Sequence, residues 1–114
     1  MRYALLIHEH PTTYDGLGDE ERRAITAEYL ALRDDPRVVD GARLHPPAAT
    51  TTIRVDDGET LVADGPFADT KEVFGGWYLL EADDLDAAIA VAERIPALRM
   101  GGGVEIRPLV EYAR

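Results

Sequence analysis

Residues 64–72 read Asp64-Gly65-Pro66-Phe67-Ala68-Asp69-Thr70-Lys71-Glu72, and they mark a point where the chain must turn. Gly65 can adopt φ values that are closed to other residues, and Pro66 fixes its own φ and donates no backbone hydrogen bond. Three acids and one lysine lie within the nine residues. A bend of this kind brings side chains from different elements together, so we expect a functional site beside it.

A β-hairpin is predicted immediately before the bend. Thr50–Val55 is rich in β-branched residues, and Thr60–Ala63 is the expected return strand. Asp57-Gly58 between them is a strong signal for a two-residue hairpin turn. Such a turn pairs Asp56 with Glu59, and this pairing sets the register of the whole hairpin.

The register decides which way Asp64 points. Counted back from the turn, Thr51 lies opposite Asp64. Alternate residues of a strand share a face, so Asp64 lies with the apolar Ile53, Val55 and Val62. We expect partial desolvation of a carboxylate that ends an apolar face. Asp64 is then either a general acid or base poised by burial, or a turn aspartate that accepts backbone hydrogen bonds.

The rest of the chain predicts two helices and four further strands. The strands are expected over residues 3–8, 38–44, 75–81 and 104–110, the second being interrupted at Gly41. One amphipathic helix is capped by Asp19 and ends near Asp35, and the other is capped by Asp83 and ends at Pro96. The expected inner faces consist of Ile25, Tyr29 and Leu32 in the first helix and Leu85, Ile89 and Ala92 in the second.

This order of elements predicts an α+β fold in a single domain over residues 1–114. The pattern is β-α-β, a small hairpin, and β-α-β, which is the ferredoxin-like split βαβ plan with an inserted β-hairpin. The antiparallel sheet then carries two helices on one face only. Its other face needs a cover, and the economical cover is the same face of a second copy, so we expect a homodimer.

Composition excludes several classes of function. The net charge is -10, from 22 acidic residues against 12 Lys plus Arg, which argues against binding nucleic acid or an anionic membrane. The chain has no cysteine, so disulfides, thiolate catalysis and cysteine-type metal sites are excluded. No apolar run approaches the roughly 20 residues of a membrane span, and the N-terminus lacks a signal-peptide pattern. The cytoplasm is the expected location.

Motifs spread over nearly the whole chain, in order, form a known pattern. They are Met1-Arg2-Tyr3-Ala4-Leu5-Leu6-Ile7, Pro46-Pro47-Ala48-Ala49-Thr50, Asp64-Gly65-Pro66-Phe67, Gly75-Gly76-Trp77-Tyr78, Asp83-Asp84-Leu85-Asp86 and Val104-Glu105-Ile106-Arg107-Pro108. With them the chain resembles the YCII-related proteins, in the subgroup named for its Asp-Gly-Pro-Phe (DGPF) motif.

The resemblance implies a dimeric α+β barrel, in which two ferredoxin-like sheets pack face to face. The subgroup has no generally established activity, although a histidine–aspartate pair in the pocket is suspected of enzymatic work in the wider family. The subgroup also occurs near genes for extracytoplasmic-function sigma factors, which suggests a regulatory link to a sigma factor. This chain has His8 where many relatives carry tyrosine, and Arg99-Met100-Gly101 where the last turn usually reads Arg-Tyr-Gly, so specificity does not carry over.

Asp64 and His8 are the candidate catalytic pair, by analogy with the suspected pair of the family. Otherwise His8 is a hydrogen-bonded histidine at a strand end. Glu72 with Asp64 would form a carboxylate pair with split pKa values, and Lys71 would anchor an anionic ligand or neutralise Asp64. A structural salt bridge is the alternative for Lys71 and Glu72. We expect six ligand-binding residues: Arg54, Phe67, Lys71, Glu72, Trp77 and Tyr78.

The positions of three of these residues on strands explain why we expect them to bind a ligand. Arg54 lies on a strand, where it would clamp a carboxylate ligand or bridge surface acids. Trp77 and Tyr78 are adjacent in a strand, so one faces each side of the sheet. The inward residue would line a cavity and stack on a ligand ring, unless both are simply core residues.

A metal site is a weaker alternative. In a strand, His8 and His10 project to the same face, and His45 or Asp64 would supply a third ligand for zinc or iron. We expect no metal and no cofactor. Three functions remain: a small-molecule-binding or regulatory homodimer with a pocket near Asp64, a cofactor-independent acid–base enzyme using Asp64 and His8, and a structural interaction module. Whether the protein is an enzyme stays open.

Overall fold

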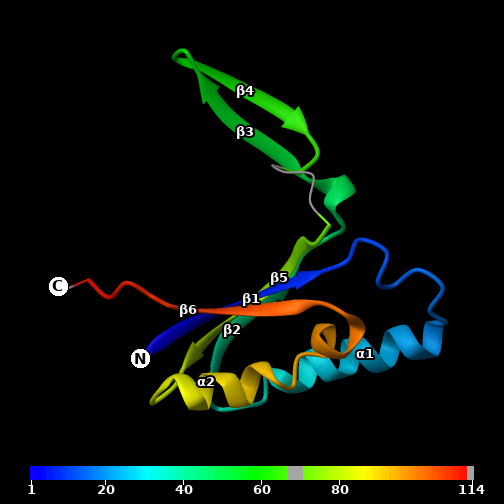
Figure 1. The fold of residues 1–114 in the computed structure, drawn as a ribbon, viewed down its shortest axis with the longest axis vertical. Helices are drawn as coiled ribbons and strands as arrows, with labels where there is room; N and C mark the ends of the chain where they lie inside the picture. The colour runs from blue at the N-terminus through cyan, green and yellow to red at the C-terminus, as the bar shows by residue number, and fades with distance from the viewer. Residues whose placement is uncertain (67–70, 113–114) are drawn as a thin grey trace.

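The chain folds into a four-stranded antiparallel sheet with two helices and a separate two-stranded hairpin (Figure 1). The computed structural model describes residues 1–66 and 71–112. The elements follow the order β1 (Arg2–Glu9), α1 (Asp19–Leu32), β2 (Val38–Arg43), η1 (Pro47–Ala49), β3 (Thr51–Asp56), β4 (Glu59–Asp64), β5 (Val73–Glu81), α2 (Leu85–Ala92), η2 (Pro96–Met100) and β6 (Gly103–Pro108).

The sheet has the strand order β2-β5-β1-β6. The central strand β1 pairs antiparallel with β5 on one side and with β6 on the other. Both helices lie on one face of this sheet (Figure 1). A small α+β fold with two helices and an antiparallel sheet in this order is consistent with the predicted ferredoxin-like plan.

The core lies between the sheet and the helices. Alternate residues of β1, namely Tyr3, Leu5 and Ile7, are buried there. The predicted inner face of α1 is confirmed, because Ile25, Tyr29 and Leu32 are all buried. Tyr78 points into the same core, and its hydroxyl donates a hydrogen bond to the Tyr29 carbonyl at 2.7 Å. Burial raises the pKa of Tyr78 to about 12, so the phenol stays a neutral donor.

The predicted inner face of α2 is wrong. Ala88, Val91 and Ala92 are buried, whereas Leu85 and Ile89 are exposed. The cap is also one residue later than predicted, since the Asp84 side chain accepts a hydrogen bond from the Ala87 backbone at 2.8 Å. The helix is apolar around most of its circumference, so several helical stripes fit its sequence equally well. The small Ala88 and Ala92 allow the helix to approach the sheet closely.

Three further details, two in α1 and one in β2, differ from the prediction. Helix α1 has Gly18 at its N-cap position, without a side-chain cap, and it ends at Leu32, before Asp35. In β2 the register shift lies between Val38 and Asp40 and not at Gly41, which pairs with Tyr78. A Cβ at Gly41 would lie 2.5 Å from the Tyr78 ring, so the glycine serves packing and not an interruption of the strand.

The hairpin register agrees with the register counted from the turn. Asp56 pairs with Glu59, and Thr51 pairs with Asp64. Asp57 and Gly58 have φ values of 49° and 79°, as a two-residue hairpin turn of the type I′ class requires.

The burial expected for Asp64 is wrong. Asp64 is exposed, and so are Ile53, Val55 and Val62 on the same face of the hairpin. The register specifies only which residues share a face, and a face becomes buried only when a second layer covers it. Within the described residues no such layer lies over the hairpin, which rises from the sheet on the side away from the helices (Figure 1).

The sheet face opposite the helices is also without a cover among the described residues. By strand alternation and register it presents Leu6 and His8 from β1, Trp77 and Leu79 from β5, and Glu105 from β6. We call these five residues the open sheet face. Leu6, Trp77 and Leu79 are only half-buried. Trp77 and Tyr78 therefore lie on opposite faces of the sheet, as their adjacency predicted.

Candidate functional site

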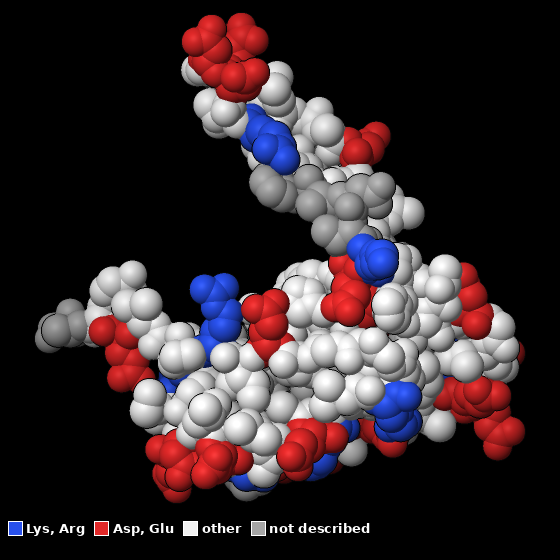
Figure 2. All heavy atoms as spheres, in the orientation of Figure 1, with Lys and Arg blue, Asp and Glu red and all other residues white. Residues whose placement is uncertain are grey.

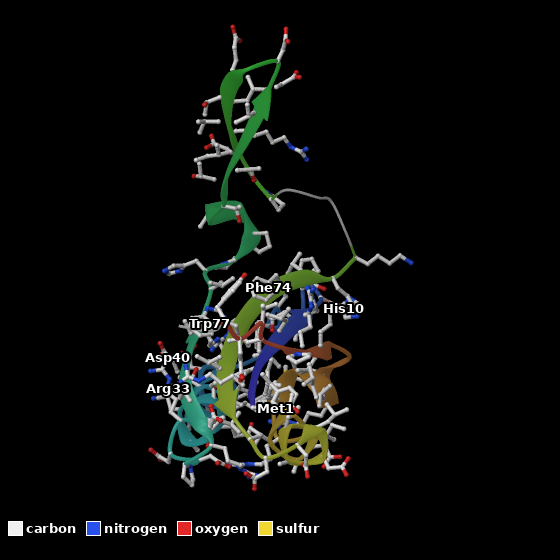
Figure 3. The ribbon with its side chains drawn as sticks, turned by 90° about the vertical axis from the view of Figure 1, so that its left-hand side faces the viewer. Met1, His10, Arg33, Asp40, Phe74 and Trp77 are labelled. Atoms are coloured by element: carbon white, nitrogen blue, oxygen red, sulfur yellow. The ribbon has the colours of Figure 1, made fainter. Side chains whose placement is uncertain are left out.

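A cleft of about 520 Å³ lies where the sheet meets the base of the hairpin. This volume falls within the roughly 300–1,000 Å³ typical of small-molecule sites. Its walls are mainly apolar side chains with a few polar groups, and the lining residues are His8, Leu44, His45, Pro46, Pro47, Ala49, Thr50, Pro66, Glu72, Val73 and Phe74. Phe74 and Trp77 both come from β5 and lie below the hairpin (Figure 3).

Local sequence builds the hairpin side of this cleft. Pro46 and Pro47 end regular pairing after β2, and η1 carries the chain into β3. At the base of the hairpin, away from its turn, the Gly65 backbone N–H donates a hydrogen bond to the Thr50 carbonyl at 2.8 Å. Gly65 has a φ of 101°, a conformation that favours glycine. The bend predicted at Gly65-Pro66 thus closes the hairpin base and puts Pro66 in the wall.

His8 is the central titratable group of the cleft. Its Nε2 atom lies 2.6 Å from a carboxylate oxygen of Glu105, and its ring lies 5.8 Å from the Phe74 ring between centroids. Among the described residues His8 Nε2 makes no hydrogen bond, so its contact with Glu105 is a close approach that is an ion pair only when the imidazole carries a proton on both nitrogens. A carboxylate beside a histidine can orient the ring and stabilise its protonated form.

The predicted site residues are distributed over three places. His8 and Glu72 line the cleft, Trp77 lies on the open sheet face, and Tyr78 lies in the core. The described lining residues do not include Asp64, Arg54 or Lys71, all of which are exposed. Phe67 falls outside the described residues.

The carboxylate that the structure brings to His8 is that of Glu105. The His8–Asp64 pair stays a prediction, as does Asp64 as a catalytic residue. Glu105 comes from β6, far from His8 in the sequence, and only the pairing of β1 with β6 brings the two together.

Among residues 1–66 and 71–112, no group of three or more His, Cys, Asp or Glu residues converges as metal ligands. The alternative site of His8, His10 and either His45 or Asp64 is therefore not assembled in this structure. The reason is that β1 ends at Glu9, so strand alternation no longer places His10 beside His8. His10 instead lies near Gly101, where an added Cβ would be 3.6 Å from the imidazole Cδ2.

A second cluster beside the cleft was missed by the sequence analysis. The Tyr14 hydroxyl donates a hydrogen bond to a Glu9 carboxylate oxygen at 2.7 Å. The Arg43 guanidinium lies 5.2 Å from the ring centroids of both Tyr14 and Tyr29. Burial, together with the hydrogen bond to Glu9, raises the pKa of Tyr14 well above its ordinary value. The cluster holds the loop before α1 against the sheet, and no local pattern indicates it because its members come from four segments.

None of the helices in residues 1–66 and 71–112 combines the length and the apolar character that crossing a bilayer requires.

Comparison with solved structures identifies the class of fold. The structure is similar to that of 5-chloro-2-hydroxyhydroquinone dehydrochlorinase (TftG) from Burkholderia phenoliruptrix AC1100, determined in complex with 2,5-dihydroxybenzoquinone. The TM-score is 0.54 with 15% sequence identity, over 98% of this chain and 96% of the other. At this identity the likeness is one of fold, and it agrees with the small α+β architecture described above.

Sequence comparison identifies the family. The profile of the YCII-related domain matches residues 1–113. The chain is also 34% identical over 117 residues to the uncharacterized protein R00369 of Rhizobium meliloti (strain 1021), covering 98% of this chain and 94% of that protein. The protein belongs to the YCII-related domain family.

Proposed function

We propose that the protein is a homodimer that binds a small molecule in the cleft at the base of the hairpin. The observation that carries this proposal is the cleft of about 520 Å³, which combines apolar walls with His8 and Glu72. Pockets of this size with a few placed polar groups are the usual form of small-molecule sites. We place the protein in the DGPF-motif subgroup on its Asp64-Gly65-Pro66-Phe67 sequence, and we regard β3 and β4 as a hairpin inserted into a ferredoxin-like domain.

The open sheet face supports the dimer. Leu6, Trp77 and Leu79 are half-buried in the single chain and have no layer above them among the described residues. Two antiparallel sheets commonly pack face to face about 10 Å apart, which buries such residues between them. We therefore propose that two copies join through this face to make the dimeric α+β barrel that the family resemblance implies.

The lining suggests the chemistry of the ligand. Phe74, Val73 and the prolines offer flat apolar walls that suit an aromatic ring. His8, His45 and Glu72 offer donors and acceptors for hydroxyl or carbonyl groups on that ring. We propose hydroxylated aromatic or quinone ligands. The TftG complex contains a ligand of this class, and for the present protein it guides only the choice of probe.

Binding is tested by calorimetry and thermal unfolding with 2,5-dihydroxybenzoquinone and a panel of hydroxybenzoates. A ligand present at 100 times its Kd should raise the free energy of unfolding by about 2.7 kcal/mol. Phe74→Ala should weaken binding by about tenfold or more, because it removes one apolar wall. Leu85→Ala, an exposed change on α2, is the matched control and should bind as the wild type does. The proposal fails if no probe binds at millimolar concentration, or if Phe74→Ala binds as tightly as the control.

A second candidate function is acid–base catalysis without a cofactor. The observation that favours it is the position of His8, which lines the cleft with the Glu105 carboxylate 2.6 Å from its Nε2. Histidine is suited to proton transfer near neutral pH, and a neighbouring carboxylate orients the ring. In this candidate the neutral imidazole of His8 accepts a proton from a ligand hydroxyl, the Glu105 carboxylate faces the imidazolium that results, and Asp64 is the further acid predicted from the sequence.

Three substitutions separate the two candidates. For a ligand that is turned over, His8→Gln should lower kcat by roughly 100-fold or more while binding changes little. Asp64→Asn tests the predicted acid, and Glu59→Gln at the hairpin tip is the control. An unchanged rate in His8→Gln would remove the enzymatic candidate. Ligand-dependent stabilisation without turnover would favour a binding role, and the sigma-factor neighbourhood of the subgroup makes regulation the natural form of that role.

A further inference from the structure

We propose that the β3–β4 hairpin is an arm that packs its Ile53, Val55 and Val62 face against the second copy of the chain. The proposal rests on the homodimer of the proposed function, and it adds a second contact surface to the open sheet face. It concerns how the two copies hold each other, and it is independent of whether the cleft binds a ligand.

The two faces of the hairpin differ in chemistry. Ile53, Val55 and Val62 project to one face, and their side chains are 65%, 70% and 66% exposed. The opposite face is mixed: it carries Arg54 and the acids that flank the turn, and Leu61 is its one large apolar side chain. Three neighbouring β-branched residues exposed to this degree form an apolar stripe that water does not stabilise. An isolated two-stranded hairpin is at best marginally stable, so this stripe needs a partner surface.

The described part of the same chain does not supply that surface. Strands β3 and β4 pair only with each other among the described strands, in a sheet of their own. The hairpin rises away from the helices, and its outer part stands clear of the described residues of the sheet and helices (Figure 1). Figure 2 shows the same separation with side chains in place, and acidic residues gather at the hairpin tip. The tip is therefore suited to water, while the apolar stripe occupies the middle of the hairpin, from Val55 beside the turn pair to Ile53 and Val62.

The length of the arm matches a second sheet. Strands β3 and β4 have six residues each, which corresponds to about 20 Å of extended chain. A second sheet packed on the open sheet face would lie about 10 Å away. A hairpin that rises on that side therefore extends past the second sheet and lies alongside it. By two-fold symmetry each copy would clasp the other.

The exposed area also fits a second copy. The chain exposes 8,026 Å², whereas a folded monomer of 12.5 kDa typically exposes about 6,200 Å². The excess of about 1,800 Å² is more than the roughly 800 Å² per partner of a standard interface, and it matches the larger obligate homodimers. The radius of gyration, 16.1 Å against about 13 Å for a compact chain of this length, shows in the same way that the chain is extended for its size.

The decisive test compares two adjacent residues of β4. Val62 lies on the apolar stripe, and Leu61 lies on the other face with 46% of its side chain exposed. Sedimentation over a dilution series gives the dimer Kd of the wild type, Val62→Asp and Leu61→Asp. Val62→Asp should raise the dimer Kd at least about 30-fold, because it places a charge where the two methyl groups of Val62 would be buried in the proposed interface. Leu61→Asp should change the Kd by less than about threefold.

Two readouts separate the arm from the sheet contact. Trp77 is the only tryptophan of the sequence and lies on the open sheet face, so its emission reports the sheet contact. The sequence has no cysteine, so Thr60→Cys, on the same face as Val62, takes a single polarity-sensitive dye. We expect both signals to shift together as the protein dimerises.

An arm deletion supplies an independent variant. The Gly65 N–H and the Thr50 carbonyl are hydrogen-bonded at 2.8 Å, so an Asn-Gly turn can replace residues 51–64 between them. This variant should keep its helices by circular dichroism and dimerise more weakly.

The outcomes are distinct. A wild type that is monomeric at all concentrations overturns the homodimer and the arm together. A dimer with buried Trp77 in which Val62→Asp behaves like Leu61→Asp overturns the arm alone. A dye signal at position 60 that is apolar and independent of concentration would mean that the arm packs on its own chain, which also overturns the proposal.

Discussion

The four-stranded sheet and the β3–β4 hairpin have the same antiparallel pairing, but their apolar side chains differ in burial. In the sheet, Leu5 and Leu80 are completely buried under the helices. In the hairpin, Ile53 and Val62 pair with each other and remain largely exposed. Alternation assigns residues to faces in both regions, but among the described residues a second layer covers the sheet and not the hairpin. Strand periodicity therefore predicts which residues share a face and does not predict burial.

The two regions also depend on contacts of different range. The sheet is held by side chains that come from β1, β5 and both helices. The hairpin is specified by a local turn and by cross-strand pairs of six-residue strands. Substitutions of the same chemistry should therefore have large effects in the sheet and small effects in the hairpin.

The largest expected difference is between two leucines. Leu80→Ala should lower the free energy of unfolding by about 3–4 kcal/mol, because it removes a fully buried side chain and leaves a cavity. Leu61→Ala, in the hairpin, should lower it by less than about 0.5 kcal/mol. Urea unfolding followed by circular dichroism measures both. Equal effects would mean that the hairpin is packed as tightly as the sheet, which would contradict the difference in burial between the two regions.

A second, smaller difference is expected between two glycines. A Cβ at Gly102 would lie 2.4 Å from the His8 carbonyl oxygen and 3.0 Å from that of Ala97, so the backbone must shift. Gly102→Ala should lower the free energy of unfolding by about 2–3 kcal/mol.

Gly58 is the matched glycine of the hairpin turn. It has a φ of +79° and open space around it, so Gly58→Ala should lower the free energy of unfolding by about 1 kcal/mol, confined to the turn. Hydrogen exchange locates the loss. Global destabilisation by Gly58→Ala would contradict the local character of the hairpin.

The smallest difference concerns charge. Asp35, just beyond α1, accepts hydrogen bonds from the Arg37 guanidinium at 2.8 Å and from the Arg94 guanidinium at 2.7 Å. The hydrogen bonds from Arg37 are the main cause that holds the pKa of Asp35 well below its ordinary value, and Arg94 adds to them. The Asp35 side chain is only 6% exposed because Arg37 and Arg94 cover it. The two arginine side chains are themselves 38% and 48% exposed, so the ion pairs lie at the surface of the protein. Solvent screening should keep its contribution to about 1 kcal/mol.

The sign of the pH dependence follows from the lowered pKa. Because the folded value lies below the unfolded value of about 3.9, the stabilisation is present above that pH and is lost as the pH falls through the folded pKa. Asp35→Asn should therefore unfold more easily than the wild type at pH 7, and the difference should shrink at pH 3 and below. Asp57→Asn, in the hairpin turn, should show no such difference. A constant effect of Asp35→Asn from pH 7 to pH 2 would contradict the ion-pair explanation.

Features set by local chemistry were predictable residue by residue. The Asp57-Gly58 turn determines the hairpin register because both residues tolerate positive φ, and the spacing of Ile25, Tyr29 and Leu32 identifies the inner face of α1. The inner face of α2 was not predictable, because the residues of that helix are apolar on nearly every side.

In the candidate site, too, some features were predictable from local sequence and others were not. His8 and Glu72 were candidates because of their residue type and place in the chain, and both line the cleft. Glu105 beside His8, and Tyr14 beside Glu9 and Arg43, could not be predicted. Their members lie on separate elements, and no spacing in the sequence measures the distance between them.

The order of the helices and strands, the register of the hairpin and the family could be predicted from the sequence, because each depends on neighbouring residues or on motifs in order. Which faces are buried, which carboxylate meets His8 and where a cleft opens became known from the folded chain alone. Burial and convergence depend on a second layer, and layers are made by segments that are distant in the chain. At the hairpin, and at the open sheet face beneath it, we propose that this second layer belongs to another copy of the protein.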